Sequence, residues 1–476
     1  MISLNKMVIV ASLILTVAFI PFSKGMTSVL IYNDPNYSSF ANSLQAVDNQ
    51  AFNESIDDTI TQFMLEGHIT TLAASVVYKD SIIWSKGYGE QSDVNTAFII
   101  ASITKTFTAT ALLQLYEQGL FDLEEDVNNF LPFSLRNPNY PDTPITFSQL
   151  LLHQSSLLRG GEFYQSFVFN DLEQQLGETN ETLPAFPTWL DDVLLSQNTS
   201  EVWATWAPGK PQWHLTYSNL GYDLLGYLVE LISDQTIEEY FQSNIFNPLN
   251  MTKTHYTYQS YSADELASPN EWIPDDRNVE NYPTDENDDF NLPFFNLDEL
   301  GAGALRSTVT DLGHYLIAHM NKGMYKNNRI LSEESINLMH NTSQVFYGGK
   351  IYDSYGYGWM NNIINTVEMN GESFLQPLQG HGGRTYGYNS LMFFNQDVEL
   401  GVILLVNQGF LFVPEFSNEW EIFDVLYKEG LRVSITSRSE KTSGFSFCLF
   451  SLTLFLQVIF LKFRHHKLNK READFR

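Results

Sequence analysis

The chain has a single cysteine in 476 residues, and this scarcity excludes several kinds of protein. Cys448 lies in an apolar segment near the C-terminus, so the remainder of the chain contains no disulfide, cysteine nucleophile or cysteine-ligated zinc site. The ten histidines include no H-E-x-x-H pair, and we predict neither a metal nor a cofactor. The stability of the folded part must therefore come from packing.

Basic residues are also few: 26 Lys and Arg stand against 56 Asp and Glu, which gives a formal net charge of −30. Such a charge repels phosphate backbones, so we expect no nucleic-acid partner. Hydrophobic residues make up 43% of the chain and aromatic residues 14%, enough to bury a sizeable core. The composition predicts a folded globular body, in which no internal repeat is visible.

The N-terminus has the pattern of a secretory signal peptide over residues 1–25. Lys6 is followed by an apolar run from Met7 to Phe22, and the small-x-small set Ser23-Lys24-Gly25 offers a cleavage point after Gly25. An uncleaved anchor is the alternative.

A second apolar segment lies near the C-terminus. Gly444 to Leu461 carries no charge and is long enough to span a bilayer. It follows a Ser/Thr-rich linker at 431–443 and precedes a basic tail at 462–476, so it predicts a transmembrane helix rather than a buried core helix. We therefore expect a single-pass protein of the cell membrane, with the body outside the cytoplasm and the tail inside. Six N-x-S/T sequons fit this placement, but chance would produce about as many.

Alternating apolar residues predict two β-hairpins at the ends of the folded body. One pairs Leu72–Tyr78 with Ile82–Tyr88, and the other pairs Thr385–Phe394 with Glu399–Val406. Between residues 119 and 300, helical patterns and long loops dominate. A helical stripe near the end of the body is expected to lie against the sheet; it consists of Phe416, Trp420, Phe423 and Tyr427.

The stretch Ser102-Ile103-Thr104-Lys105 places a hydroxyl and an amine three residues apart where a helix is expected to begin. Apolar residues continue on one stripe until Gly119 offers a stop, so Ser102 and Lys105 should share a face. A lysine in a desolvated pocket near the positive end of a helix holds its proton less tightly and can activate the hydroxyl. Alone, however, an S-x-x-K of this kind also arises by chance.

Two further motifs follow. Tyr217-Ser218-Asn219 precedes an amphipathic helix, and His381-Gly382-Gly383 precedes the segment from Thr385, which places it in the first part of that strand. Taken singly, the first could be a tyrosine at the edge of the core followed by a helix cap. The second could be a glycine-rich turn with a surface histidine.

Taken in order, the three motifs resemble those of the penicillin-recognising serine hydrolases, in which S-x-x-K, Y-x-N and K-T-G or H-x-G line one cleft. The motifs are similar to those of the class C branch of serine β-lactamases and of related esterases, D-amino-acid peptidases and LACTB-like proteins. Further stretches carry the same resemblance: Phe98 to Ala101, Ile145 to Leu157, Gly301 to Leu312 and Tyr355 to Trp359.

The resemblance implies an α/β (α+β) fold of the β-lactamase/transpeptidase type over residues 54–430: an antiparallel sheet flanked by helices, plus a mostly helical lobe. Ser102 would attack a carbonyl, and Lys105 with Tyr217 would remove and relay its proton; which of the two is the main base stays open. The substrate would contact the remaining motif residues. These are Asn219, His381, Gly382, Gly383 and Arg384, the last supplying a backbone N–H to the oxyanion together with that of Ser102.

Departures from the family pattern bear on the substrate. His381 and Gly382 stand where most β-lactamases of this branch have Lys and Thr, which removes a fixed positive charge that would hold a carboxylate. We therefore predict a membrane-anchored serine hydrolase acting on small-molecule or peptide esters or amides. The alternatives are a catalytically silent extracellular binding protein of the same fold, or a true β-lactamase or D-amino-acid peptidase. Ser156 also replaces the usual Gly of the stretch from Ile145 to Leu157. We make no prediction about the oligomeric state.

An acidic segment, Asp275 to Asp289, interrupts the middle of the body. We expect a solvated surface loop, with a border of the cleft as the alternative. The opening spacing of an EF-hand is present here, but Phe290 replaces the required Gly and Asn296 the bidentate acid, so no calcium site is predicted.

Overall fold

The computed structural model describes residues 51–441 except 90–91, 159–161, 178, 180–181, 196–205, 207–210, 212–214, 273–288, 341–345, 348–349, 352–353, 370–371 and 410–417. The predicted signal peptide, transmembrane segment, basic tail and nearly all of the acidic segment lie outside the described residues. The chain divides into two units, and the fold below is that of the unit Phe52–Leu431.

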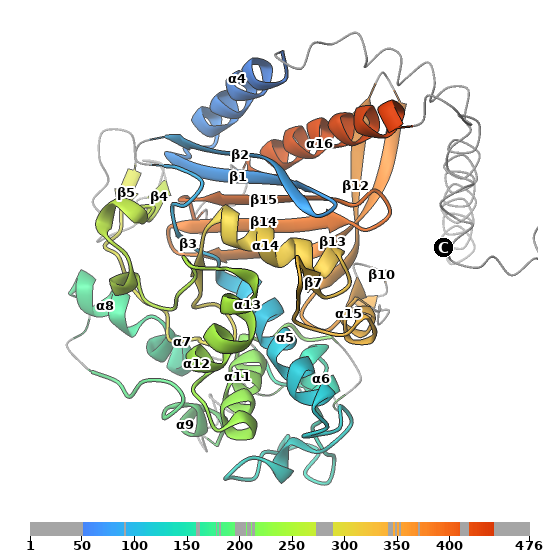
Figure 1. The fold of residues 1–476 in the computed structure, drawn as a ribbon. Helices are drawn as coiled ribbons and strands as arrows, with labels where there is room; N and C mark the ends of the chain where they lie inside the picture. Colours follow the sequence, from blue (N-terminus) through green and yellow to red (C-terminus); the bar gives the residue numbers. More distant parts are fainter. Residues whose placement is uncertain are drawn as a thin grey trace, which may run out of the picture. The chain divides into compact units, whose positions relative to one another are not determined.

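An antiparallel sheet of seven strands forms the centre of this unit, with the order β11-β12-β13-β14-β15-β1-β2 (Figure 1). Strands from the two ends of the sequence meet where β1 pairs with β15, Leu72 facing Val406. The predicted sheet is confirmed. Both predicted hairpins are present, since β1 pairs with β2 and β14 with β15, although β14 begins at Tyr388 and not at Thr385. The strands are β1 (Thr71–Tyr78), β2 (Ser81–Gly89), β11 (Ser354–Tyr355), β12 (Met360–Met369), β13 (Glu372–Thr385), β14 (Tyr388–Asn395) and β15 (Leu400–Val406).

The position of the third motif differs from the prediction. His381-Gly382-Gly383 lies near the end of β13, not at the start of the strand that includes residues 388–395. A tight turn at Tyr386 and Gly387 separates the two strands, and Gly387 has φ +70°, a conformation that glycine adopts without strain. Because this turn reverses the chain, the motif and β14 are neighbours in the sheet.

Side chains alternate between the two faces of the sheet and so build two cores. On one face, Leu72, Val402 and Leu404 pack with residues of the helices α4 (Ala51–Glu66) and α16 (Glu419–Lys441). On the other face, Ala73 and Ile403 pack with α5 (Thr104–Glu117) and with α14 (Val309–Met320). Figure 1 shows α14 along the face opposite α4 and α16.

The expected helical stripe of α16 is present where the structure describes it. Phe423 and Tyr427 are fully buried, and Trp420 lies 5.2 Å from Phe393 of β14, measured between ring centroids. Phe416 lies outside the described residues. The helix continues to Lys441, so most of the predicted linker at 431–443 is helical.

A mostly helical lobe lies between α5 and α14, as predicted. Its helices are α6 (Phe147–Leu151), α7 (Glu162–Val168), α8 (Asn170–Leu176), α9 (Leu190–Leu194), α11 (Asn219–Ser233), α12 (Ile237–Phe241) and α13 (Asn247–Leu249). The unit also contains the short helical turns η1 (Ala101–Ile103), η2 (Val127–Asn129), η3 (Gln242–Phe246), η4 (Tyr258–Ser260) and η5 (Ala263–Glu265), and the helix α15 (Glu333–Met339). Pairs of short strands lie outside the main sheet: β3 (Phe98–Ile99) with β6 (Arg306–Ser307), β4 (Asn270–Trp272) with β5 (Asp289–Asn291), β7 (Met324–Tyr325) with β8 (Asn328–Arg329), and β9 (Phe346–Tyr347) with β10 (Lys350–Ile351).

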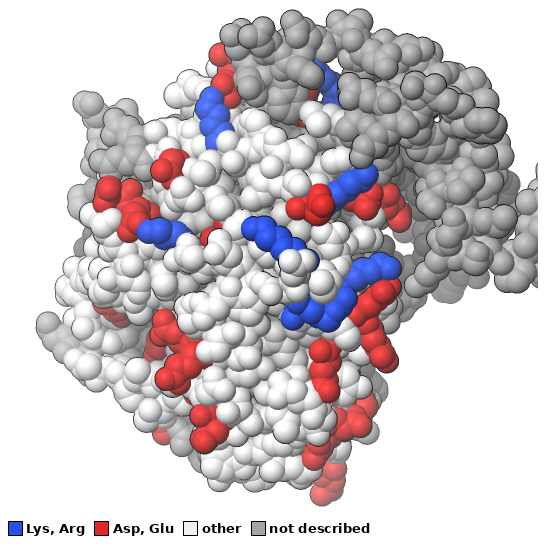
Figure 2. Space-filling model, in the orientation of Figure 1, with Lys and Arg blue, Asp and Glu red and all other residues white. Residues whose placement is uncertain are grey.

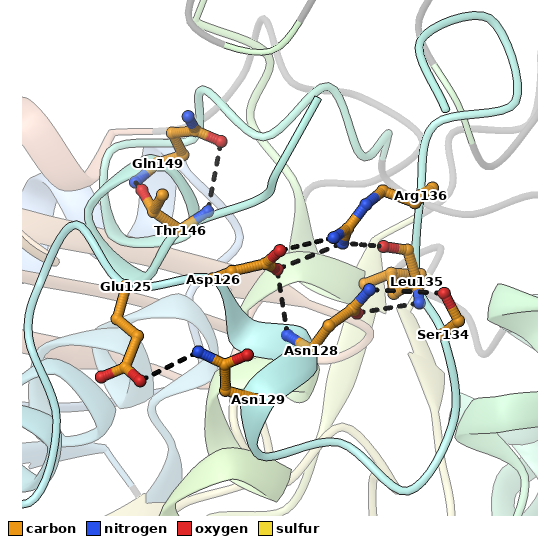
Figure 3. A network of polar contacts seen from close by, with 9 residues as sticks. All are labelled: Glu125, Asp126, Asn128, Asn129, Ser134, Leu135, Arg136, Thr146 and Gln149. Atoms are coloured by element: carbon orange, nitrogen blue, oxygen red, sulfur yellow. Dashed lines mark hydrogen bonds and ion pairs between the residues drawn. The ribbon is translucent and has the colours of Figure 1, made fainter. Parts of the chain in front are cut away.

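A polar network holds the loop that leads into α6 (Figure 3). The guanidinium of Arg136 donates to both carboxylate oxygens of Asp126, and Asp126 also accepts from the backbone N–H of Asn128 at 3.1 Å. Thr146 and Gln149 form a capping box at the start of α6. These bonds give α6 a defined start, and the chain leaving α6 enters the candidate site.

Within the described residues, none of the helices combines the length and the apolar character needed to cross a bilayer.

Candidate active site

The first motif brings a hydroxyl and an amine together at the start of α5. Ser102 lies in the turn η1 and Lys105 in the first turn of α5, so their side chains share a face. Lys105 Nζ donates to Ser102 Oγ at 3.1 Å and to the carbonyl oxygen of Ala302 at 2.8 Å. Lys105 is fully buried, and in the described part of the chain no carboxylate lies within ion-pair distance of it.

The second motif lies at the entrance to α11. Ser218 is the N-cap, its hydroxyl accepting from the backbone N–H of Gly221 at 2.8 Å. The cap places Tyr217 beside the lysine: Lys105 Nζ lies 5.0 Å from the centroid of the Tyr217 ring. The Tyr217 ring therefore lies next to the amine of the Ser102–Lys105 pair.

His153, at the end of the stretch that begins with α6, orients the second motif. Its Nδ1 accepts from the backbone N–H of Ser218 at 3.1 Å, and its ring lies 4.3 Å from that of Tyr217. Three residues later, Ser156 has φ +68°, the left-handed region in which the family's usual Gly is free of strain. Asn137 Nδ2 donates to Ser156 Oγ at 2.8 Å, a hydrogen bond that a glycine at this position could not make.

The third motif faces the first two from β13. His381 Nδ1 lies 2.6 Å from the carbonyl oxygen of Gly382 and therefore carries the hydrogen, which leaves Nε2 to accept from the Tyr355 hydroxyl at 3.0 Å. Burial, reinforced by the nearby charge of Lys105, lowers the pKa of His381 to about 3. At neutral pH the imidazole is uncharged, so it offers no cation to a substrate carboxylate.

At Gly383, β13 lies very close to the backbone around Ser102. A Cβ at this position would lie 2.2 Å from the carbonyl oxygen of Ile100 and 2.9 Å from the backbone nitrogen of Ser102. Only a glycine permits this approach, which brings the strand alongside the Ser102 N–H. The side chain of the next residue, Arg384, pairs with Glu419 of α16 at 3.2 Å.

Asn219 contacts a buried carboxyl group that sequence reasoning missed. Its Nδ2 donates to Glu299 Oε2 at 3.0 Å, while within the described residues nothing donates to its buried Oδ1. Asp223 lies one helical turn further along α11 and is fully buried. A charged residue within the apolar stripe of α11 was a visible signal for Asp223. No pattern in the sequence indicated Glu299, because its partner Asn219 lies 80 positions away.

The structure therefore gathers residues from all three motifs around Ser102 and Lys105. Tyr217 and His381 are adjacent, with ring centroids 6.2 Å apart. The structure also brings Tyr355 and His153 to this site. In the sequence these two residues belonged only to stretches that resemble the family. The arrangement supplies a nucleophile, a buried amine, a phenol and a close-lying strand, which are the parts needed for acyl transfer. Among the described residues no group of His, Cys, Asp and Glu is suited to hold a metal ion.

Comparisons with known proteins agree with this arrangement. A family model described as Beta-lactamase matches residues 56–427. Protein flp of Staphylococcus aureus (strain MRSA252) is 25% identical over 370 residues, covering 76% of this chain and 64% of its own length. Beta-lactamase-like protein 4 of Dictyostelium discoideum is 26% identical over 363 residues, covering 70% and 56%. The chain thus spans less than two thirds of the length of these curated relatives.

Two solved structures share the fold. The octameric penicillin-binding protein homologue from Pyrococcus abyssi has a TM-score of 0.59 at 24% identity, covering 80% of this chain and 77% of that one. A D-amino acid amidase from Ochrobactrum anthropi SV3, solved with L-phenylalanine amide, has a TM-score of 0.60 at 19% identity, covering 79% and 98%.

Proposed function

The chain belongs to the beta-lactamase family, and from this premise we propose that it is a serine hydrolase that works through an acyl-enzyme at Ser102. The observation that carries the proposal is the 3.1 Å contact between Lys105 Nζ and Ser102 Oγ, made by a fully buried lysine. A hydroxyl is a weak nucleophile until a base removes its proton, and an amine at hydrogen-bond distance can do so.

The reaction follows from this geometry. Ser102 Oγ attacks the substrate carbonyl while its proton passes to Lys105, directly or through Tyr217. The oxyanion is held by the backbone N–H groups of Ser102 and Arg384. The proton then moves to the leaving group, the acyl group stays on Ser102 as an ester, and water releases it by the same steps in reverse order.

Esters and amides are the substrates we propose. The uncharged His381 imidazole cannot clamp a carboxylate as a lysine does, which disfavours β-lactams. The amidase with a similar fold lends support to amide bonds as a target. A catalytically silent binding protein is disfavoured, because the contact between Lys105 and Ser102 is intact.

We further propose that the enzyme is tethered to the cell membrane by residues 444–461, with its catalytic unit outside the cytoplasm. The support is the charge-free run followed by Lys462, Arg464 and further basic residues. The large negative charge argues against nucleic acid as a partner. On the face drawn in Figure 2, the described residues show scattered acidic side chains and no continuous basic patch.

Labelling with a fluorophosphonate tests the proposed activity. We expect a covalent adduct on Ser102 and a loss of esterase activity of about 10³-fold or more in Ser102→Ala and in Lys105→Ala. Ser85→Ala is the matched control, since Ser85 is exposed on β2 away from the cleft and should be labelled like the wild type. An adduct on another serine, with Ser102→Ala fully active, would overturn the proposal.

A further inference from the structure

Two carboxyl groups are buried together next to the nucleophile's lysine. Asp223, on α11, is fully buried, and Glu299, in the segment before β6, is 7% exposed. Both contact Tyr164 of α7, whose hydroxyl oxygen lies 2.7 Å from Asp223 Oδ2 and 3.3 Å from Glu299 Oε2. Acids this deeply buried are rare unless they are paired or protonated.

Counting hydrogens shows that the pair of carboxyl groups holds a proton. The Tyr164 hydroxyl has one hydrogen, so it can donate to only one of the two carboxyl groups. The second contact is balanced only if one carboxyl brings a proton. A proton on either carboxyl balances these contacts. We place it on Asp223 Oδ2, so that Asp223 donates to Tyr164 and Tyr164 donates to Glu299.

The remaining contacts fit the same assignment. Asp223 Oδ1 accepts from the backbone N–H of Gly301 at 3.1 Å, as a neutral carboxyl oxygen can. Glu299 Oε2 also accepts from Asn219 Nδ2, which an ionised carboxylate favours. Burial, and next the charge of Glu299, raises the pKa of Asp223 well above its usual range. Burial also raises the pKa of Glu299, but Lys105 opposes that rise.

Glu299 is also joined to Lys105 through the backbone. The carbonyl oxygen of Glu299 accepts from the N–H groups of Ala302, Gly303 and Ala304 at 3.0, 2.8 and 3.2 Å. This turn presents the Ala302 carbonyl to which Lys105 donates. The same residue therefore shapes the contacts of Lys105 and of Asn219.

We propose that Glu299 is a positioning residue: its buried negative charge is the counter-charge of Lys105 and holds the Asn219 amide with Nδ2 inward, while Asp223 stays protonated. This inference rests on the acyl-enzyme chemistry proposed above. A carboxylate accepts and cannot donate, so it fixes which end of the Asn219 amide turns toward it. An opposite charge nearby stabilises an ammonium group, so Glu299 also stabilises the charge of Lys105.

Other titratable groups face this cluster from the surrounding elements. The carboxyl pair faces Tyr164 and Lys105, and Tyr256 lies within electrostatic range of Asp223. Lys105 faces Tyr217 and Tyr222, whose ring centroids lie 5.0 and 5.7 Å from Nζ, and it acts electrostatically on His381. Burial holds His381 neutral, and it raises the pKa values of Tyr164, Tyr222 and Tyr256 well above their usual range. Glu299 is thus the anion of the cluster.

The test compares two isosteric variants of the same cluster in the full-length protein. Glu299→Gln removes the charge but keeps an acceptor for Asn219, whereas Asp223→Asn mimics the protonated acid. The readout is the acidic limb of the pH profile of kcat/KM for p-nitrophenyl acetate between pH 5 and 9. The background rate measured with Ser102→Ala is subtracted at each pH. This limb reports the free enzyme's base.

We expect Glu299→Gln to move the acidic limb to lower pH by about one unit, because Lys105 loses its counter-charge. One unit below the wild-type midpoint, the variant should then keep roughly fivefold more of its plateau activity. Asp223→Asn should leave the limb in place. An unmoved limb in Glu299→Gln, or an equal shift in both variants, would overturn the inference. Absence of a Ser102 adduct in the wild type would instead overturn the proposed function.

Discussion

At the scale of single residues, His381 carries the clearest consequence for substrate choice. Its imidazole is neutral and already engaged with Tyr355, so it adds hydrogen bonding but no positive charge to the cleft. A missing charge-assisted pair typically costs about 1.5 to 3 kcal/mol, or roughly ten- to over a hundredfold in rate. We therefore expect p-nitrophenyl acetate or butyrate to be turned over with a higher kcat/KM than nitrocefin.

His381→Lys combined with Gly382→Thr should shift this ratio toward nitrocefin by about tenfold or more. A side chain at residue 382 has room, because a Cβ there would meet its nearest neighbours at 3.4 and 3.5 Å. Gly382→Thr alone is the control for that added volume. A wild type already efficient on nitrocefin and indifferent to the double change would place selectivity elsewhere, with the segment from Trp272 to Phe295 as the next candidate.

At the scale of elements, the contact between β13 and the turn η1 is the feature on which the proposed oxyanion site depends. Ser390 of β14 reinforces it, since its hydroxyl donates to the carbonyl oxygen of Ile100 at 2.9 Å. Gly383→Ala would push a methyl group into that carbonyl and force the strand away from Ser102. Losing oxyanion donors costs about 10²- to 10³-fold in kcat, so we expect a decrease of that order in kcat.

Gly382→Ala is the matched control on the same strand. Its new methyl group meets only ordinary van der Waals contacts, so fluorophosphonate labelling and the melting temperature should stay close to those of the wild type. Steady-state kinetics of both variants with p-nitrophenyl acetate decide the matter. Equal kinetics in the two variants would show that the close approach at Gly383 is not required for catalysis.

At the scale of the whole molecule, the described unit Phe52–Leu431 has both of its cores without the C-terminal apolar segment. If residues 444–461 are a membrane anchor, a chain ending before Gly444 should be recovered in the soluble fraction with its esterase activity. Fractionation of membranes from cells expressing the full-length and truncated chains measures this. Full-length protein that is soluble without detergent, or truncated protein that stays in the membrane after signal cleavage, would contradict the assignment.

The amino-acid sequence by itself determined the features that depend on short-range spacing. Ser102 and Lys105 are three residues apart, which places them on one face of a helix in any fold that keeps the helix. Ser218 caps its own helix for the same local reason. Both hairpins followed from alternating side chains, and the order of the three motifs indicated the family and with it the antiparallel sheet and the helical lobe.

Only the tertiary structure decided which distant residues meet. The chain turns at Gly387, so the third motif lies in β13 and not in the strand that follows. No periodicity in the sequence indicates this reversal. Tyr355 reaches His381 from another strand of the sheet, and Glu299 reaches Asn219 across 80 positions. These contacts arise when the lobe and the sheet pack together and exclude water, because burial then forces polar groups to find partners wherever in the chain they lie.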